Sequence, residues 1–203
     1  MTAMTYSRYL HLETLLDLQH PLTPPEQQDL HDSERLFIVI HQASETLLGQ
    51  ALTDLRHIEA DRCARQCLAR RVDRATQLID AMEGQLRVLR RTLDPDDFAV
   101  FRERLGTASG LQSAQFHELF AVVERLTPHA DRHVPVAFRR LETLRTAVRR
   151  WRCTHLDLVE HMIGGSSGTG RTSGTDYLER RLNGPAGGDT VRTATSAAPR
   201  ASS

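Results

Sequence analysis

The chain has 203 residues, and its 26 basic and 26 acidic side chains give a formal net charge of zero at pH 7. A protein of this length can bury a sizeable core, and its balanced charge argues against a polyanionic partner such as a nucleic acid. All of its basic residues other than histidine are arginine. The absence of lysine excludes Schiff-base chemistry and a Walker-type phosphate loop.

No apolar run approaches the roughly 18 residues of a membrane span, and the polar start of the chain does not resemble a signal peptide. The sequence therefore predicts a cytoplasmic protein that does not enter a membrane. Three cysteines, Cys63, Cys67 and Cys153, form neither a disulfide framework nor a zinc motif. We interpret them as reduced thiols that fill space or lie on the surface.

Apolar residues recur at spacings of three and four along most of the chain, and no useful length alternates as a strand would. This pattern predicts an all-α helical bundle. A short helix is expected over Tyr6–Leu18, before a proline-rich segment. A long helix is expected to begin near Asp32 as its N-cap, and its Arg-rich continuation through Cys63 and Leu93 allows one break at an unspecified position.

A short helix is then predicted between Asp94 and Gly106, because Asp94 can cap it, Pro95 suits its first position and glycine terminates it. Further helices are expected near Gln115–Leu126 and after a Pro/His linker over 128–135. Beyond residue 182, the Gly/Pro/Ala/Ser/Thr composition is typical of a disordered tail. We therefore expect one helical domain over 1–182 and a tail over 183–203.

Single histidines lie on the apolar stripes of the two long helices. His155 shares its stripe with Trp151, whereas His161 is rotated about 240° from it at 100° per residue, so the pair cannot hold one ion. His155 could be the axial ligand of a haem, which suits an apolar wall with one imidazole. His41, one turn after Phe37, could face the same cofactor. The alternative for both residues is a hydrogen-bonded histidine in the core.

Arg102 lies one turn after Phe98, on the apolar side of the predicted short helix. It could pair with an acidic residue of a neighbouring helix, or it could clamp a substrate carboxylate with two hydrogen bonds. The Gly/Ser/Thr loop over 164–174 offers backbone donors and hydroxyls, a pattern that on its own has little specificity.

Five separated blocks resemble, in sequence and in order, the tryptophan 2,3-dioxygenase family of haem enzymes. The blocks are TYSRYLHLETLLDLQHP, HDSERLFIVIHQASETLL, DFAVFRERLGTASGLQSAQF, WRCTHLDLVEHMIG and GTGRTSGTDYL. The resemblance implies an all-helical pocket for haem b, usually in a homotetramer, between the long helices. It also implies insertion of both atoms of O₂ across the C2–C3 bond of the indole of L-tryptophan, giving N-formylkynurenine.

The resemblance also implies a role for each matching residue. His155 looks like the haem iron ligand, with Trp151, Ser109 and Gly110 as further haem-binding residues. His41 looks like the catalytic histidine that faces the indole N–H. The remaining substrate-binding residues implied are the indole walls Phe37, Phe98 and Leu105, the carboxylate clamp Arg102, the ammonium-binding Thr169, and Tyr6 and Tyr9, which in the family reach a neighbouring subunit.

Some positions depart from the family motifs. Gly49 stands where the family has lysine, His161 stands where arginine is usual, and Arg171 replaces a glycine beside Thr169. The segment between Arg102 and His155 is also shorter than in typical members. Three alternatives to the dioxygenase therefore stay open: a haem monooxygenase of a tryptophan derivative in specialised metabolism, a non-catalytic haem-binding module, and a helical interaction protein without a cofactor.

Overall fold

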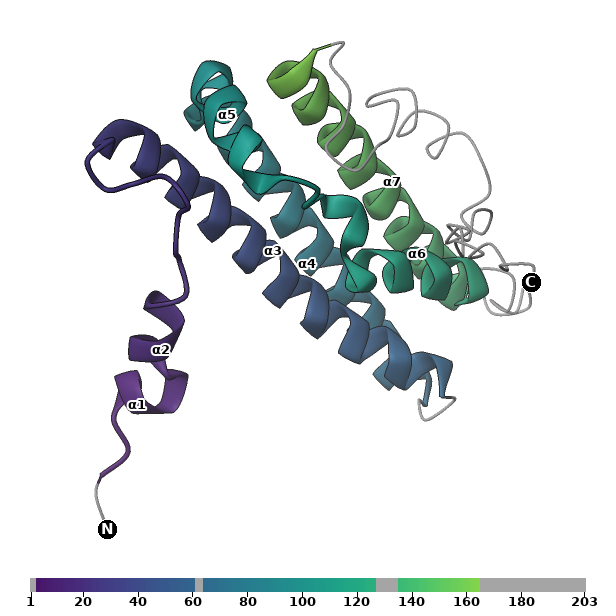
Figure 1. Cartoon of the computed structure of the whole chain (residues 1–203). Helices are drawn as coiled ribbons and strands as arrows, with labels where there is room; N and C mark the ends of the chain where they lie inside the picture. Colours follow the sequence, from purple (N-terminus) through teal and green to yellow (C-terminus); the bar gives the residue numbers. More distant parts are fainter. Residues whose placement is uncertain (1–2, 61–63, 127–134, 165–203) are drawn as a thin grey trace, which may run out of the picture.

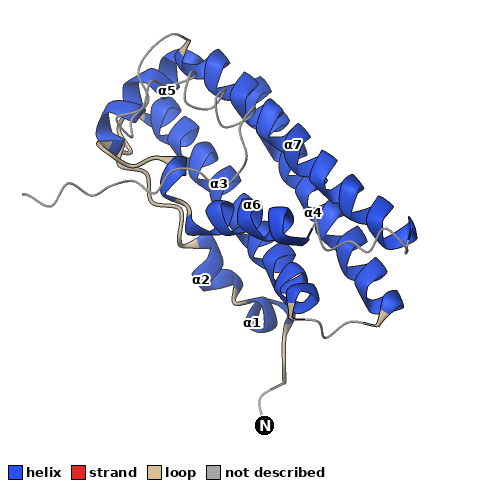
Figure 2. Ribbon diagram, turned by 90° about the vertical axis from the view of Figure 1, so that its right-hand side faces the viewer, coloured by secondary structure: helices blue, strands red, loops and turns tan. Residues whose placement is uncertain are grey.

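The computed structural model describes residues 3–60, 64–126 and 135–164. Every regular element within these ranges is helical, which confirms the predicted all-α class (Figure 2). The elements are α1 (Tyr6–Leu10), α2 (Leu12–Leu16), α3 (Gln28–Glu59), α4 (Arg65–Thr92), α5 (Pro95–Arg102), α6 (Ala114–Leu126) and α7 (Pro135–Ile163), with the 3-10 turns η1 (Glu103–Leu105) and η2 (Gly110–Gln112) between α5 and α6.

Three long helices form the frame of the molecule (Figure 1). Helix α4 packs against both α3 and α7, and the shorter α5 and α6 each contact these same two helices and bridge them. The bond from Ser44 to Gln85 and that from Arg71 to Asp54 show that α3 and α4 are antiparallel. Helix α7 runs parallel to α4 (Figure 1). The N-terminal half of α3 and the C-terminal half of α7 therefore lie at the same end of the bundle.

The core lies where the three long helices face one another, and each helix contributes one apolar stripe. A fully buried Leu or Ile side chain stabilises the fold by roughly 1.5–3 kcal/mol relative to the exposed side chain. The buried stripes are Leu48, Ala51, Leu52 and Leu55 on α3, Val72, Ala75, Ile79, Met82, Leu86 and Leu89 on α4, and Leu141, Leu144, Ala147, Val148 and Trp151 on α7. The apolar residues that recur at helical spacing in these segments therefore form the core of the bundle.

Helix α3 begins at Gln28, and the predicted N-cap at Asp32 is wrong. A turn that joins the Gln27 amide to the Pro24 carbonyl precedes the helix, and the helical bonding starts directly after it. The buried Glu34 carboxylate then accepts bonds from the amides of Leu22 and Thr23, each at 2.8 Å, and from the Thr23 hydroxyl at 2.5 Å. These bonds fix the loop before α3 against the bundle.

The segment before this loop forms two short helices instead of the single predicted one over Tyr6–Leu18. His11 separates α1 from α2 in the left-handed conformation, with φ at 51°. The two helices contact each other but no other helix of the described chain, and both project away from the bundle (Figure 1). A helix that packs against nothing is marginal at this length, which explains the interruption. We call residues 5–18 the N-terminal arm.

The predicted short helix and the predicted break are confirmed. The Asp94 carboxylate accepts a bond from the Asp96 amide at 2.8 Å, Pro95 starts α5, and Gly106 ends the following turn with φ at 58°. The one break that the sequence allowed lies between α3, which ends at Glu59, and α4, which begins at Arg65. Among the described helices, none combines the length and the apolarity needed to cross a bilayer. The predicted tail over 183–203 lies outside the described residues.

Candidate functional site

His41 lies in the N-terminal half of α3 and is fixed by the turn that precedes it. Its Nδ1 is 2.7 Å from the Phe37 carbonyl oxygen, and the two rings pack with their centroids 4.0 Å apart. Because a carbonyl can only accept, Nδ1 must carry the proton, which leaves the lone pair on Nε2. Burial lowers the pKa of His41, while the Phe37 carbonyl and the charge of Glu45 oppose that shift.

Three phenylalanines, of which Phe37 contacts this histidine, join α3 to α5. The Phe37 ring centroid is 5.7 Å from that of Phe98 and 5.5 Å from that of Phe101, and the last two rings meet edge to face at 5.3 Å. Phe101 is fully buried, although the sequence analysis did not single it out. We call Phe37, His41, Phe98 and Phe101 the His41 cluster.

A second group of rings surrounds His155 and joins α7 to α6. The His155 ring stacks on Trp151 with an interplanar angle of 5° and a centroid distance of 5.3 Å. Trp151 in turn stacks on Phe116 at 4.5 Å and lies 6.4 Å from Phe120. The sequence analysis missed both phenylalanines, although their spacing of one helical turn is a signal for a shared face. We call Phe116, Phe120, Trp151 and His155 the His155 cluster.

His155 is partly buried, and its ring makes no hydrogen bond within the described part of the chain. Burial, and then the charge of His41, lowers its pKa to about 4. His155 is therefore neutral at pH 7 and carries a lone pair, which is the form of imidazole that binds a metal. This environment differs from that of a hydrogen-bonded core histidine, the alternative raised by the sequence.

The two histidines lie at the same end of the bundle because α3 and α7 run in opposite directions. The effect of the His41 charge on the pKa of His155 means that the two rings lie within electrostatic reach of each other. His161, by contrast, is exposed on another side of α7. Among the described residues no group of three or more His, Cys, Asp or Glu side chains could hold a metal ion.

Other residues predicted for the site lie on or after α5. Arg102 is the last residue of α5 and is partly buried, one turn after Phe98. Leu105 packs against the core, whereas Gly110 is exposed at the start of η2. The Ser109 amide donates to the Gln112 side chain at 3.2 Å. Helix α5 thus brings Phe98 to His41, while Ser109 and Gly110 occupy the turn that leads to α6.

Two further predicted residues, Tyr6 and Tyr9, lie apart from the histidines of their own chain. Tyr6 and Tyr9 lie on the N-terminal arm with 76% and 70% of their surfaces exposed. Thr169 and Arg171 lie outside the described residues.

A departure from the family motif is accommodated locally at Gly49. A Cβ atom at this position would lie 3.1 Å from the Gln115 side-chain oxygen. The Gln115 amide group donates to the Glu45 carboxylate at 2.7 Å. The space beside Gly49 is therefore used to tie α6 to α3, one turn beyond His41.

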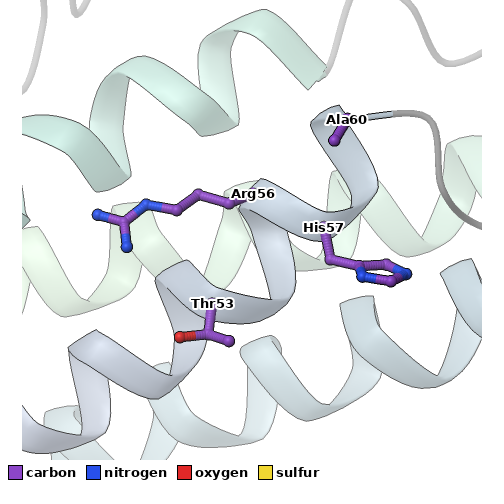
Figure 3. A pocket seen from close by; sticks show the side chains of 4 residues that line it. All are labelled: Thr53, Arg56, His57 and Ala60. Carbon is purple, nitrogen blue, oxygen red and sulfur yellow. The ribbon is translucent and has the colours of Figure 1, made fainter.

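An open depression of about 400 Å³ lies elsewhere, near the C-terminal end of α3 (Figure 3). Its lining residues are Thr53, Arg56, His57 and Ala60. His57 is 16 residues after His41, or about 24 Å along the helix axis at 1.5 Å per residue. The depression is therefore separate from the site between the two ring clusters.

Comparison with known proteins gives consistent matches. Residues 1–129 match the family model described as tryptophan 2,3-dioxygenase. A tryptophan 2,3-dioxygenase of Ruegeria pomeroyi is 30% identical, with 88% of this chain and 88% of that protein aligned. One from Burkholderia lata is 28% identical, with 89% of this chain and 79% of that protein aligned.

Proposed function

The chain belongs to the tryptophan 2,3-dioxygenase family of oxidoreductases, and we propose that it inserts O₂ into the indole ring of L-tryptophan or of a close tryptophan derivative. The proposed reaction adds both oxygen atoms across the C2–C3 bond and gives an N-formylkynurenine-type product, with haem b as cofactor. The observation that carries the proposal is a neutral imidazole at His155, without a hydrogen bond in the described chain and within electrostatic reach of His41.

The residues around His155 suit a haem. The group is flat and largely apolar, and the ring clusters of α3–α5 and α6–α7 supply matching walls. The Trp151 indole nitrogen is buried and has no acceptor in the described part of the chain. A haem propionate could accept a hydrogen bond from this N–H, which would remove the cost of leaving a buried donor unpaired. When bound, the haem iron supplies the binding and activation of O₂.

On the opposite side, His41 suits the indole of the substrate. Its Nδ1–H is committed to the Phe37 carbonyl, so its Nε2 lone pair is available to accept the indole N–H. Phe37, Phe98 and Leu105 would enclose the ring and exclude water. Arg102 would hold the carboxylate with charge-assisted bonds, and Thr169 would receive the ammonium group, as the family motif implies.

The N-terminal arm favours a homo-oligomer, which in the family is a tetramer. Tyr6 and Tyr9 are exposed and lie apart from the histidines of their own chain. We therefore place them in the substrate site of a neighbouring copy, together with the exposed Leu15 and Leu16 of the arm. We also propose that residues 1–182 form one helical domain.

The test compares absorbance spectra of the full chain, produced with added haem, with those of His155→Ala. We expect a Soret band in the wild type, and haem affinity lower by at least about 100-fold in the variant, because loss of a direct ligand exceeds the 10–100-fold effect of a residue behind it. His161→Ala is the matched control on the same helix. A Soret band that survives His155→Ala unchanged would show that the ligand is wrongly assigned.

A turnover assay then separates the reaction classes. The wild type is supplied with O₂ and L-tryptophan, and the product is identified by absorbance and mass. Addition of two oxygen atoms supports the dioxygenase, whereas addition of one supports a monooxygenase. A Soret band without product from any indole would point to a non-catalytic haem-binding module, and a colourless protein would point to an interaction protein.

A further inference from the structure

A buried carboxylate joins α4 to α7 beside His155. Glu83 of α4 is 4% exposed, and its carboxylate accepts bonds from two residues of α7: from the Arg150 guanidinium, and from the Thr154 hydroxyl at 3.1 Å. The Arg87 guanidinium of α4 donates to the same carboxylate at 2.5 Å. Because Thr154 directly precedes His155, these bonds fix α7 against α4 at the residue before the proposed haem ligand.

The anchored residues of α7 lie next to the residues that form the His155 cluster. Arg150 and Thr154 are one helical turn apart, and so are Trp151 and His155, each one position further along the chain. At 100° per residue, the second pair lies on the neighbouring face of the helix. The first pair bonds to α4, whereas the rings of the second pair stack on each other beside α6. The bonds to Glu83 therefore fix the direction in which the two rings point.

A small rotation of α7 would displace the His155 ring. Within the described residues the ring makes no hydrogen bond, whereas a histidine that binds a metal usually makes one that orients it. Its direction is thus determined by the backbone of α7 and by the stack on Trp151. An atom about 6 Å from the helix axis moves about 1 Å when the helix turns by about 10°. This displacement exceeds the roughly 0.5 Å within which a binding group must be held.

We propose that Glu83 is a positioning residue for the haem ligand: it fixes the rotation of α7 through Arg150 and Thr154, and so the direction of the His155 ring. The inference rests on the proposed function, because it requires that His155 binds the haem iron. The alternative is a group of ion pairs that only stabilises the bundle. This alternative predicts that the loss of any buried carboxylate acts through stability alone, wherever the carboxylate lies in the fold.

The test compares Glu83→Gln with Glu34→Gln in the full chain loaded with haem. Both carboxylates are buried and accept bonds from three groups of the described chain, but those to Glu34 come from the loop before α3 and not from α7. We expect Glu83→Gln to lower haem affinity about 10-fold, the lower end of the effect of a residue behind a metal ligand. It should also shift and broaden the iron–histidine stretching band in the resonance Raman spectrum of the ferrous protein. Glu34→Gln should change neither quantity.

A second pair of variants removes only a hydroxyl. Thr154→Val deletes the bond to Glu83 beside His155, so it should shift the same Raman band and lower haem affinity by about threefold, as expected for one hydrogen bond. Thr146→Val is the control on the same helix, because the Thr146 hydroxyl donates to the Glu142 carbonyl of α7 itself at 2.8 Å. If Glu83→Gln does not fold, this second pair decides the question.

Failure of this inference differs from failure of the proposed function. A wild type that acquires no Soret band would overturn both. A wild type with a Soret band, whose Raman band stays unchanged in Glu83→Gln and in Thr154→Val, would overturn only the role of Glu83. Equal losses of haem affinity in Glu83→Gln and Glu34→Gln would likewise overturn that role, because they would show that both carboxylates act through stability alone.

Discussion

The histidines of the two ring clusters differ in their hydrogen bonding. In the His41 cluster, the histidine ring donates to the Phe37 carbonyl at 2.7 Å and packs on the Phe37 ring, which in turn packs on Phe98 and Phe101. In the His155 cluster, the ring is stacked on Trp151 and makes no hydrogen bond within the described residues. Both clusters are aromatic and both lie between a long and a short helix, so the difference lies in the hydrogen bonding.

Because of this difference, His41 is suited to accept a hydrogen bond, whereas His155 is suited to bind a metal. A bond at Nδ1 fixes the ring and the tautomer of His41, and its free Nε2 can accept a hydrogen bond. An unbonded, neutral ring at His155 has a lone pair for a metal ion. The stacked rings orient His155 without using either nitrogen. Two similar helix faces thereby become suited to two different tasks.

The largest effect is expected from the packing of the His41 cluster. Phe101→Ala should lower the free energy of unfolding by about 3–5 kcal/mol, because Phe101 is fully buried and its loss leaves a cavity. Phe120→Ala, at a partly exposed ring of the His155 cluster, should cost less than half as much. Urea denaturation of the haem-free protein measures both values. Equal losses would mean that the two clusters are packed equally tightly.

The next effect is the acid sensitivity of the His155 cluster. Because the pKa of His155 is about 4 in the folded chain and about 6.5 in the unfolded one, only the unfolded chain binds this proton between those values. Stability should therefore fall as the pH drops from 6.5 to 4, by at most about 3 kcal/mol.

The acid effect can be assigned by mutation. His155→Leu should remove most of this pH dependence in the haem-free protein, whereas His41→Leu should remove less, because the Phe37 carbonyl and Glu45 oppose the lowering of the His41 pKa. Four glutamates also have lowered pKa values, and the stability linked to them is lost mainly below about pH 5, so the assignment to His155 is made between pH 6.5 and 5; they are Glu34, Glu59, Glu83 and Glu118. A profile that His155→Leu leaves unchanged would contradict the assignment.

A smaller effect is expected at the substrate carboxylate. Arg102→Leu should weaken L-tryptophan binding about 10- to 100-fold, the value of a charge-assisted bond of roughly 1.5–3 kcal/mol, and should leave haem affinity unchanged. Arg104→Leu is the control, because Arg104 is held by the Gln27 side chain at 3.1 Å. Calorimetric titration supplies the affinities. If the wild type binds tryptophan and indole equally well, Arg102 does not clamp the carboxylate.

The smallest effect is expected at the indole N–H. His41→Ala should retain the Soret band and weaken L-tryptophan binding by about three- to tenfold, since one neutral hydrogen bond contributes about 0.5–1.5 kcal/mol. An N-methylated tryptophan lacks this proton, so the wild type and the variant should bind it with similar affinity. A variant that loses the Soret band would instead make His41 part of the haem attachment.

Local sequence predicted those parts of the fold that depend on neighbours in the chain. The capped start of α5 at Asp94 and Pro95 is confirmed because capping involves only the next few residues. The start of α3 was misplaced at Asp32, because a proline turn and long-range bonds to Glu34 place it earlier. The N-terminal arm was predicted as one helix because its apolar spacing does not reveal that no partner lies against it.

The site was predictable to the same extent. His41 and His155 stood out because a lone polar residue on an apolar stripe is visible in the sequence. Phe101 and Phe116 were missed because an aromatic residue on a buried face is indistinguishable from ordinary core until its partner across the bundle is known. The missing bond at His155 is likewise a property of packing between helices.

The hydrogen bonds to the Glu34 carboxylate also affect the entropy cost of docking the N-terminal arm on another surface. Its three bonds to Leu22 and Thr23 immobilise the root of the arm in the isolated chain. When the arm binds another surface, only the residues N-terminal to Leu22 lose conformational entropy, at roughly 1–2 kcal/mol each. Because the base of the arm is already fixed, a few exposed tyrosines and leucines are enough to bind a second surface.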